Sequence, residues 1–181
     1  MSAAFTFHKA SIQDLKQLQD ISRVTFTEAF AESNSEENLR QFFEEKLNEE
    51  VLRKELMTPE SIFYLAMQEN KIAGFLKVNF AAAQTELQQE DGVELERIYI
   101  LKAFYGKGLG QQLLDMAIRI AQQKNAKFLW LGVWEHNERA LRFYQRNGFI
   151  AFDTHVFMVG PDKQTDIMMK LGLPALPLPQ L

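Results

Sequence analysis

The order of hydrophobic patterns along the chain predicts an α/β protein with a mixed sheet. Segments with alternating apolar residues, typical of strands, are interspersed with segments whose apolar residues recur every three or four positions, typical of helices. In chain order they predict a strand, two helices, three strands, a helix, a strand, a helix and two strands. The 181 residues suit one domain. We therefore expect a single domain over residues 1–172 and a proline-rich tail over residues 173–181.

The N-terminal third of the chain predicts one strand and two helices. Residues 4–9 alternate weakly and predict a short strand. Ser11 begins the pattern Ser-x-x-Asp, a near capping box, and a helix with an apolar face follows it. Ser33 and Glu36 form a second box before a helix that runs to about Leu56 and carries an acidic outer face.

Changes in the spacing of apolar residues predict the remaining elements. Alternation predicts three strands, which cover residues 62–68, 72–80 and 93–101. After them we expect a helix over about 109–123, a buried strand over 128–134, a short helix over 138–146, and a hairpin of 156–159 with 166–171. Asn137 is the expected N-cap of the short helix, and Gly148 is its expected left-handed terminating residue.

The composition excludes several kinds of chemistry. The chain has no cysteine, so it can form no disulfide, thiolate nucleophile or cysteine-type zinc or iron–sulfur site. Its net charge of −4 argues against a general nucleic-acid binder. The first residues resemble no secretory signal, and no stretch reaches the roughly 18 apolar residues that span a bilayer. We expect a cytoplasmic protein with no metal, membrane or nucleic-acid partner.

The sharpest local feature is a glycine-rich loop between a predicted strand and a predicted helix, Gly106-Lys-Gly-Leu-Gly110. Glycines let the backbone approach a ligand closely, and the helix directs unpaired amides and its positive dipole end at the loop. These features predict a cradle for a phosphate or pyrophosphate, to which Lys107 adds positive charge. From the glycines alone, a tight turn without a ligand is an equally weighted alternative.

The loop fails two common nucleotide-binding motifs. A dinucleotide fingerprint needs a third glycine where Gln111 stands and a carboxylate near Trp130, where there is none. The nucleoside-triphosphate loop needs Ser or Thr after Gly-Lys, where Gly108 stands. A nucleotide-binding module is therefore only a remote alternative.

Several motifs together resemble those of the GNAT N-acetyltransferase superfamily. The glycine loop, starting at Tyr105, is similar to the family pattern Gln/Arg-x-x-Gly-x-Gly/Ala, although Tyr105 departs from it at the first position. The other similar segments are Leu95–Ile100, Trp130–Asn137, Ala140, Phe143-Tyr144 and Asn147–Phe149. More narrowly, the run from Leu95 to Asp166, including Gln164-Thr-Asp166, resembles the PaiA-type polyamine N-acetyltransferases.

The resemblance implies a mixed, mostly antiparallel sheet flanked by helices, with a splayed central strand pair that binds acetyl-CoA. The CoA pyrophosphate would lie on the backbone of Tyr105, Gly106, Lys107, Gly108, Leu109 and Gly110. The pantetheine arm would run along Ile98, Tyr99 and Ile100, with Asn137 bonding its amides. Because backbone amides do most of the anion binding in such a loop, having Tyr105 in place of Gln or Arg is expected to remove at most one side-chain contact with the phosphate.

The implied reaction is direct attack of an amine on the thioester, which needs no enzyme nucleophile and agrees with the lack of cysteine. By resemblance, Tyr144 corresponds to the tyrosine that protonates the CoA sulfur, although residue type alone favours a core tyrosine beside Phe143. We rank Glu96 first and Glu94 second as the general base. An alternative of at least equal weight is that both are surface or edge carboxylates without a catalytic role.

The acceptor is the least determined part of the prediction. The acidic second helix, with Glu28 and Glu32, could attract a polycation, but a solvated helix face is the favoured alternative on sequence alone. The PaiA resemblance favours a small-molecule amine such as spermidine or spermine. The alternatives are another amine (a protein N-terminus, an amino acid or an antibiotic) and a non-catalytic acetyl-CoA-binding regulator. The resemblance also allows a homodimer.

Overall fold

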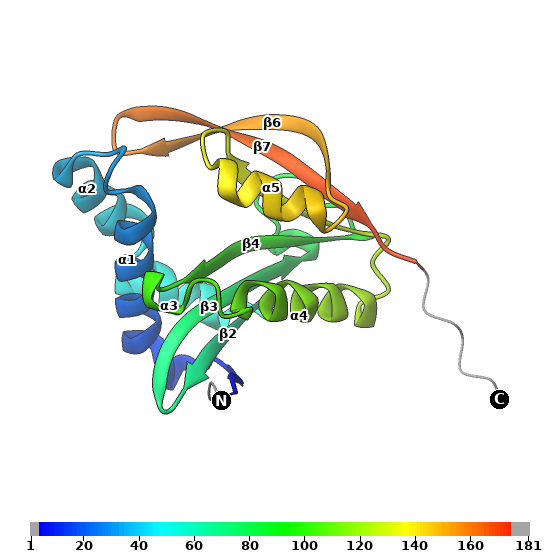
Figure 1. Cartoon of the computed structure of the whole chain (residues 1–181), viewed down its shortest axis with the longest axis horizontal. Coiled ribbons are helices and arrows are strands. Elements are labelled where there is room, and N and C mark those ends of the chain that lie inside the picture. The colour runs from blue at the N-terminus through cyan, green and yellow to red at the C-terminus, as the bar shows by residue number, and fades with distance from the viewer. Residues whose placement is uncertain (1–3, 175–181) are drawn as a thin grey trace.

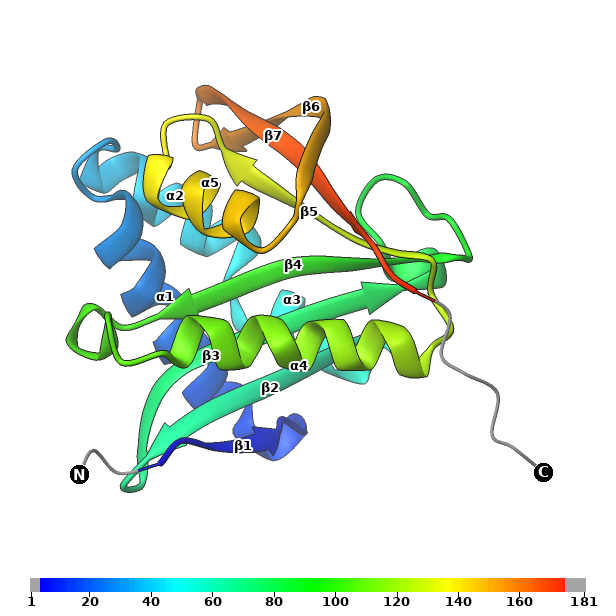
Figure 2. The ribbon, with the colours of Figure 1, turned by 45° about the vertical axis from the view of Figure 1, so that its right-hand side comes forward.

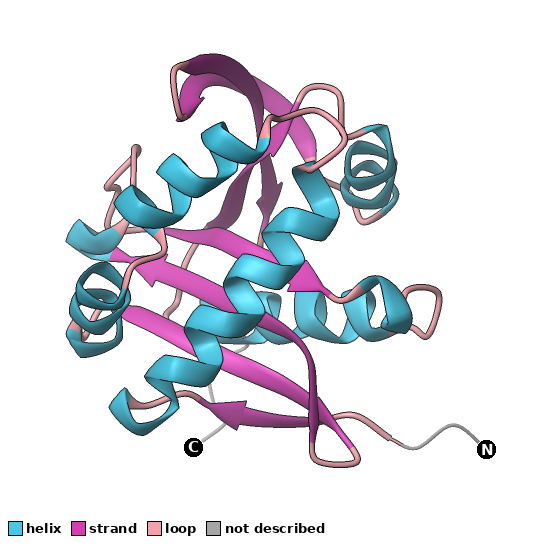
Figure 3. Cartoon of the chain, turned by 90° about the vertical axis from the view of Figure 1, so that its left-hand side faces the viewer, coloured by secondary structure: helices cyan, strands magenta, loops and turns pink. Residues whose placement is uncertain are grey.

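The computed structural model describes residues 4–174, which form a seven-stranded sheet with helices on both faces (Figures 1 and 3). The strands are β1 (Thr6–Lys9), β2 (Ser61–Gln68), β3 (Lys71–Phe80), β4 (Gly92–Ile100), β5 (Phe128–Trp134), β6 (Ile150–Val159) and β7 (Asp162–Gly172). The helices are α1 (Leu15–Phe30), α2 (Glu36–Lys46), α3 (Glu49–Met57), α4 (Leu109–Gln123) and α5 (Glu138–Arg146). The predicted α/β class is confirmed. No helix within residues 4–174 is long and apolar enough to cross a membrane.

The middle of the sheet contains one parallel strand pair. The strand order is β1-β2-β3-β4-β5-β7-β6, and within the described residues every neighbouring pair is antiparallel except β4 with β5. These two strands pair only over Gly92–Glu94 with Phe128–Trp130 and then diverge, as Figure 2 shows. The predicted splayed central pair is therefore present.

Side-chain caps decide where the N-terminal helices begin. The predicted capping box at Ser11 is present and starts a short 3₁₀ turn that leads into α1. The expected single helix that begins after Ser33 is wrong, because the segment forms both α2 and α3. Ser35 caps α2, and Asn48 caps α3 by accepting a hydrogen bond from the Val51 amide at 2.9 Å. A polar cap inside an amphipathic pattern thus separates two helices.

The C-terminal hairpin is longer than its hydrophobic pattern predicts. The expected strands covered 156–159 and 166–171, whereas β6 begins at Ile150 and β7 at Asp162. Because β6 is an edge strand with mostly exposed side chains, its residues show little of the apolar pattern that marks a strand.

The chain after β7 stays against the domain at first. The amide of Leu173 donates a hydrogen bond to the carbonyl of Lys127 at 2.7 Å, and its side chain packs on the core. The rest of the predicted proline-rich tail, from residue 175, lies outside the described residues.

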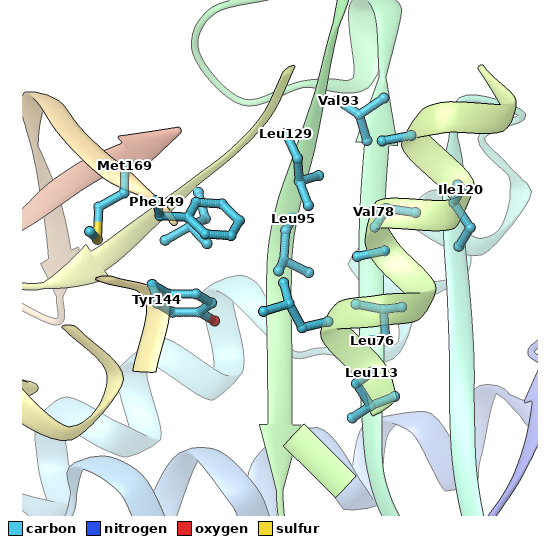
Figure 4. Packing of buried hydrophobic residues seen from close by; sticks show 14 of the residues in the cluster. Leu76, Val78, Val93, Leu95, Leu113, Ile120, Leu129, Tyr144, Phe149 and Met169 are labelled. Atoms are coloured by element: carbon cyan, nitrogen blue, oxygen red, sulfur yellow. The ribbon is translucent and has the colours of Figure 1, made fainter. Parts of the chain in front are cut away.

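The hydrophobic core covers both faces of the central strands. On one face, Leu76 of β3 and Leu95 of β4 pack against Leu113 of α4 (Figure 4). On the other face, helices α1 to α3 gather an aromatic cluster in which Phe26 and Phe42 stack with ring centroids 4.2 Å apart. Burial of each side chain of this size stabilises the folded state by about 1.5–3 kcal/mol relative to leaving it exposed. Strand β4 is therefore clamped from both sides.

Candidate active site

The glycine loop adopts a conformation that glycine accommodates best. Gly106 has φ +74° and Gly108 has φ +78°, and Gly108 immediately precedes α4. A Cβ atom at either position would meet nothing within 4 Å, so the surface above both residues is open. The first amides of α4 have no partner within the helix and face this opening. The loop can therefore hold an anion on its backbone.

Two cationic side chains flank the loop. Lys107 Nζ lies 4.8 Å from the centroid of the Phe104 ring, and the Arg139 guanidinium lies 3.9 Å from that of Tyr105. Tyr105 stands where the family pattern has Gln or Arg. Its ring contacts the guanidinium of Arg139 on α5, so a positive charge still lies beside the first residue of the loop. Cation–π contacts of this kind contribute about 0.5–1 kcal/mol at exposed sites.

Strand β4 carries one extra residue relative to β3. Lys77 pairs with Arg97 but Val78 pairs with Leu95, so Glu96 is left over as a bulge. A bulge of this kind bends its strand and re-aims the residues that follow it.

The bulge exposes backbone groups toward the diverging strand β5. The Leu101 amide donates to the Ala73 carbonyl of β3 at 2.9 Å. Because backbone groups alternate in direction along a strand, those of Ile98 and Ile100 point away from β3. Pairing between β4 and β5 has already ended at Glu94. The free edge at Ile98 and Ile100 can accept an extended ligand as if it were an added strand.

A cavity of about 600 Å³ lies beside this edge. Its wall includes aromatic side chains of α1 and α2, the middle of β4, the end of β5, and residues of β6 and β7. Its carboxylates outnumber its permanent cations; the carboxylates are Glu45, Glu55, Glu86, Glu94, Glu96 and Asp166, and the cations are Lys46 and Arg97. A second hollow of about 450 Å³ shares Trp134 and Asn137 with it and also includes Tyr105. The two hollows therefore connect the loop with the cavity.

Tyr144 lies on α5 at the cavity wall, where it is 6% exposed. Its ring packs on Phe143 and Phe149, and its hydroxyl, on the side of β4 in Figure 4, bonds to no other described residue. Burial, with a smaller contribution from Tyr99, raises the pKa of Tyr144 well above its ordinary value. The hydroxyl therefore stays protonated and can donate. The core and the reactive interpretations of this residue are compatible.

Asn137 is the N-cap of α5, as the sequence predicted. Its Oδ1 atom accepts a hydrogen bond from the Ala140 amide at 3.1 Å, and its own amide donates to the Trp134 carbonyl at 2.9 Å. Because Asn137 lines both hollows, its remaining amide hydrogens can reach a ligand that passes between them.

The carboxylate of Glu96 is committed to a buried ionic network. It lies 2.5 Å from Lys77 Nζ and 2.9 Å from the Arg97 guanidinium, and Asn79 donates to it. Lys77 and Arg97 both also bind Glu55 of α3. Burial alone would raise the pKa of Glu96, but the charges of Arg97 and Lys77 outweigh it and lower the pKa to about 2. This geometry favours a structural role for Glu96 over the role of general base.

The pKa of Glu94 is shifted in the opposite direction from that of Glu96. It is 3% exposed and accepts hydrogen bonds from the Thr85 amide and hydroxyl and from Asn79. Burial, followed by the charge of Glu96, raises the pKa of Glu94.

Sequence reasoning assigned no role to two polar residues that the structure brings together. Asp166 of β7 and His155 of β6 face each other across the hairpin and line the cavity opposite Gly132. Asp166 belongs to the segment Gln164-Thr-Asp166 that resembles the PaiA-type enzymes, and no motif includes His155. The signal in the sequence was a carboxylate at the first position of a mostly apolar predicted strand. Within residues 4–174, no group of three or more His, Cys, Asp or Glu side chains could hold a metal ion.

The anion loop, the free strand edge and the amide-lined passage between the hollows together suit a long ligand with a phosphate end, as in enzymes that use acyl-CoA. The model of the acetyltransferase (GNAT) family matches residues 15–149 of this chain. The chain therefore belongs to the GNAT acetyltransferase family, and it is an acetyl-CoA-dependent N-acetyltransferase.

Individual relatives agree with this assignment. The chain is 42% identical over 165 residues to a Lactobacillus delbrueckii subsp. lactis protein named uncharacterized N-acetyltransferase in pepI 3'region, covering 91% of this chain and 95% of that one. It is 29% identical over 150 residues to the spermidine N(1)-acetyltransferase of Thermoplasma acidophilum, covering 81% and 88%. The crystal structure of PaiA N-acetyltransferase from T. acidophilum in complex with coenzyme A matches with a TM-score of 0.77, 25% identity and coverage of 93% and 99%.

Proposed function

We propose that this enzyme transfers the acetyl group of acetyl-CoA to a primary amine of a polyamine such as spermidine or spermine. The observation that carries the proposal is the charge of the cavity, where six carboxylates face two permanent cations. An alkylamine is mostly cationic at neutral pH because its pKa is near 10.4, so an acidic cavity concentrates it. The similarity to a spermidine N(1)-acetyltransferase supports the same substrate class.

The acidic charge that suits this substrate comes only in part from where the sequence suggested, since Glu45 of α2 lines the cavity and Glu28 and Glu32 line the second hollow. The outer face of α2 pairs with its own basic residue, since Arg40 binds Glu37 and Glu44 on the solvent side. Such exposed pairs contribute little and attract ligands weakly. The carboxylates inside the cavity come mainly from β4, the connection before it and β7.

We place acetyl-CoA along the loop and the free strand edge. The pyrophosphate binds the open backbone of Tyr105–Gly110, and the pantetheine arm bonds the free groups of Ile98 and Ile100, with Asn137 across from them. The bound cosubstrate supplies an activated thioester. A backbone amide near the bulge polarises its carbonyl, a contribution that typically amounts to about 2.7–4 kcal/mol.

Tyr144 is the proposed acid. Its hydroxyl has no hydrogen-bond partner among the described residues and keeps its proton, and the residue lines the cavity. It can therefore protonate the departing sulfur. Holding amine and thioester together in one cavity can contribute roughly 7–11 kcal/mol, so no covalent enzyme intermediate is needed.

The test is a thiol-release assay with acetyl-CoA and a panel of acceptors. The panel contains spermidine, spermine, a peptide with a free N-terminus, free amino acids and a streptothricin-type antibiotic. Polyamine-dependent release above the rate of hydrolysis is expected, with acetylated product detected by mass spectrometry. Release with another acceptor and none with polyamines would contradict the substrate assignment. Tight CoA binding without transfer to any amine would instead favour a regulator.

A further inference from the structure

The cavity contains a line of three titratable side chains that the steps above do not use. Asp166 Oδ2 lies 3.7 Å from Nε2 of His155, and Nδ1 of His155 lies 3.7 Å from Oε1 of Glu86. Both separations are longer than a hydrogen bond, so the imidazole is poised between two carboxylates rather than locked to either.

This line runs from the interior of the cavity to solvent. The side chain of Asp166 is 16% exposed, that of His155 is 19% exposed and that of Glu86 is 40% exposed. Asp166 Oδ1 and His155 Nδ1 are both buried and have no hydrogen-bond partner. Buried polar atoms are normally satisfied, so unpaired ones at a cavity wall indicate a partner that arrives with the ligand.

Strand β5 leaves room for these two side chains. A Cβ atom at Gly132 would lie 3.0 Å from His155 Cε1 and 3.1 Å from Asp166 Oδ2. Any larger residue at this position would press on both groups. The glycine therefore serves the cavity as well as the strand.

We propose that Asp166 binds the cationic amine of the acceptor and accepts its proton, and that His155 and Glu86 carry the proton to solvent. This inference rests on the proposed function, since it names the residue that recognises the acceptor. It also assigns the proton acceptor to β7 rather than to Glu96, whose lone pairs are taken by Lys77, Arg97 and Asn79.

The proton balance of the step closes without another reactant. The alkylammonium gives one proton to the Asp166 carboxylate, and the freed lone pair forms the C–N bond as the C–S bond breaks. Tyr144 protonates the departing sulfur and is restored by the second proton that leaves the acylated nitrogen. One proton is released overall, from Asp166 through His155 and Glu86 to water.

The surroundings suit Asp166 to this exchange. Burial raises the pKa of Asp166 to about 6, with His155 acting in the opposite direction. A group that exchanges its proton close to neutral pH is an effective base. The titratable and charged groups that share the cavity with it are His155 of β6, Glu94, Glu96, Arg97 and Tyr99 of β4, Glu86 before β4, Glu45 and Lys46 of α2, Glu55 of α3 and Tyr144 of α5.

The first experiment compares Asp166→Asn with the wild-type chain in the thiol-release assay. We expect kcat/KM for spermidine to fall by about 100-fold or more at pH 7, and the remaining activity to rise with pH as free amine becomes available. The affinity for CoA, measured by calorimetry, should stay within about twofold. The matched control is Asp153→Asn on β6, an exposed aspartate outside the cavity, which should behave as the wild type.

The second experiment observes the acceptor site directly. The chain has three histidines, so the ring signal of His155 can be assigned in the NMR spectrum with a His155→Gln variant. Saturating the CoA-bound wild-type protein with spermidine should shift this signal, and the same titration of Asp166→Asn should not. This measurement needs no turnover and therefore separates the inference from the proposed function.

The outcomes are distinct. Wild-type turnover that Asp166→Asn retains within threefold would overturn the inference while leaving the proposed function standing. A shift of the His155 signal that depends on Asp166, without transfer to any amine, would support the binding role and overturn the proposed function. An absence of both transfer and shift would overturn both.

Discussion

The ammonium group of Lys77 on β3 lies 2.5 Å from the carboxylate of Glu96, the extra residue of β4. The side chain of Lys77 is 5% exposed and that of Glu96 is 16% exposed, and Glu55 of α3 binds the same ammonium group at 2.8 Å. The ionic network therefore links the bulge, which frees the strand edge, to the helices that line the cavity.

Lys77→Met should destabilise the protein by about 3–5 kcal/mol, because it leaves two buried carboxylates without this cation. Urea denaturation followed by circular dichroism measures the change. Lys71→Met, at the exposed start of the same strand, is the control and should change stability by less than about 0.5 kcal/mol. A loss of less than 1 kcal/mol in Lys77→Met would contradict the importance of the network.

The fold and the conformation of the glycine loop could largely be predicted from the sequence, because they depend on local patterns. The strand, the glycines at 106 and 108 and the helix of residues 109–123 are adjacent in the chain. The cap at Asn137 likewise needs only its own helix. Local signals failed at Asn48, where an amphipathic pattern continued across a helix boundary that a single side chain determined.

The acceptor side could not be predicted in the same way, because it depends on strand register. Asp166 meets Trp134 and His155 only through the β5–β7–β6 pairing. The bulge at Glu96 and its partner Lys77 come from different strands, so the surroundings that set the pKa of Glu96 appear only in three dimensions. A ranking of carboxylates by sequence position could not include either relationship.

Tyr144→Phe should lower kcat by about 10²–10⁴-fold, because the departing sulfur loses its proton donor. Since only an unpaired hydroxyl is removed, CoA affinity and folding stability should change little. Steady-state kinetics and CoA calorimetry on the same preparation measure the two effects. Tyr64→Phe, a tyrosine of β2 outside the cavity, is the control. Unchanged kcat in Tyr144→Phe would exclude its role as the acid.

Gly108→Ala should weaken CoA binding by about tenfold or more while costing roughly 1–3 kcal/mol of stability. The stability cost arises because alanine adopts a φ of +78° only with strain. The weaker binding arises because the new methyl group enters the open space above the loop where the phosphate is proposed to lie. Gly172→Ala is the control, since it has neither a positive φ nor a neighbour within 4 Å. Calorimetry that gives equal CoA affinities for Gly108→Ala and the wild type would argue against the loop as the phosphate site.

Asp166→Asn should make the unliganded protein more stable than the wild type at pH 8, although we expect it to impair catalysis. Burial raises the pKa of Asp166 to about 6 in the folded protein, above the ordinary value of 3.8. Between these two values the folded state binds more protons than the unfolded state, so stability falls as pH rises through this range. Asparagine has no charge to bury and escapes this loss.

The measurement is the melting temperature of both proteins between pH 4 and pH 8. Glu94 and Glu96 titrate in both proteins, so their contributions largely cancel in the difference. The advantage of the variant should be fully present above pH 6, shrink as pH falls through that value and be smallest near pH 4. A difference that does not change with pH would mean that the carboxylate of Asp166 is solvated as in water, and the cavity would then lack the unpaired charge that we propose selects an ammonium group.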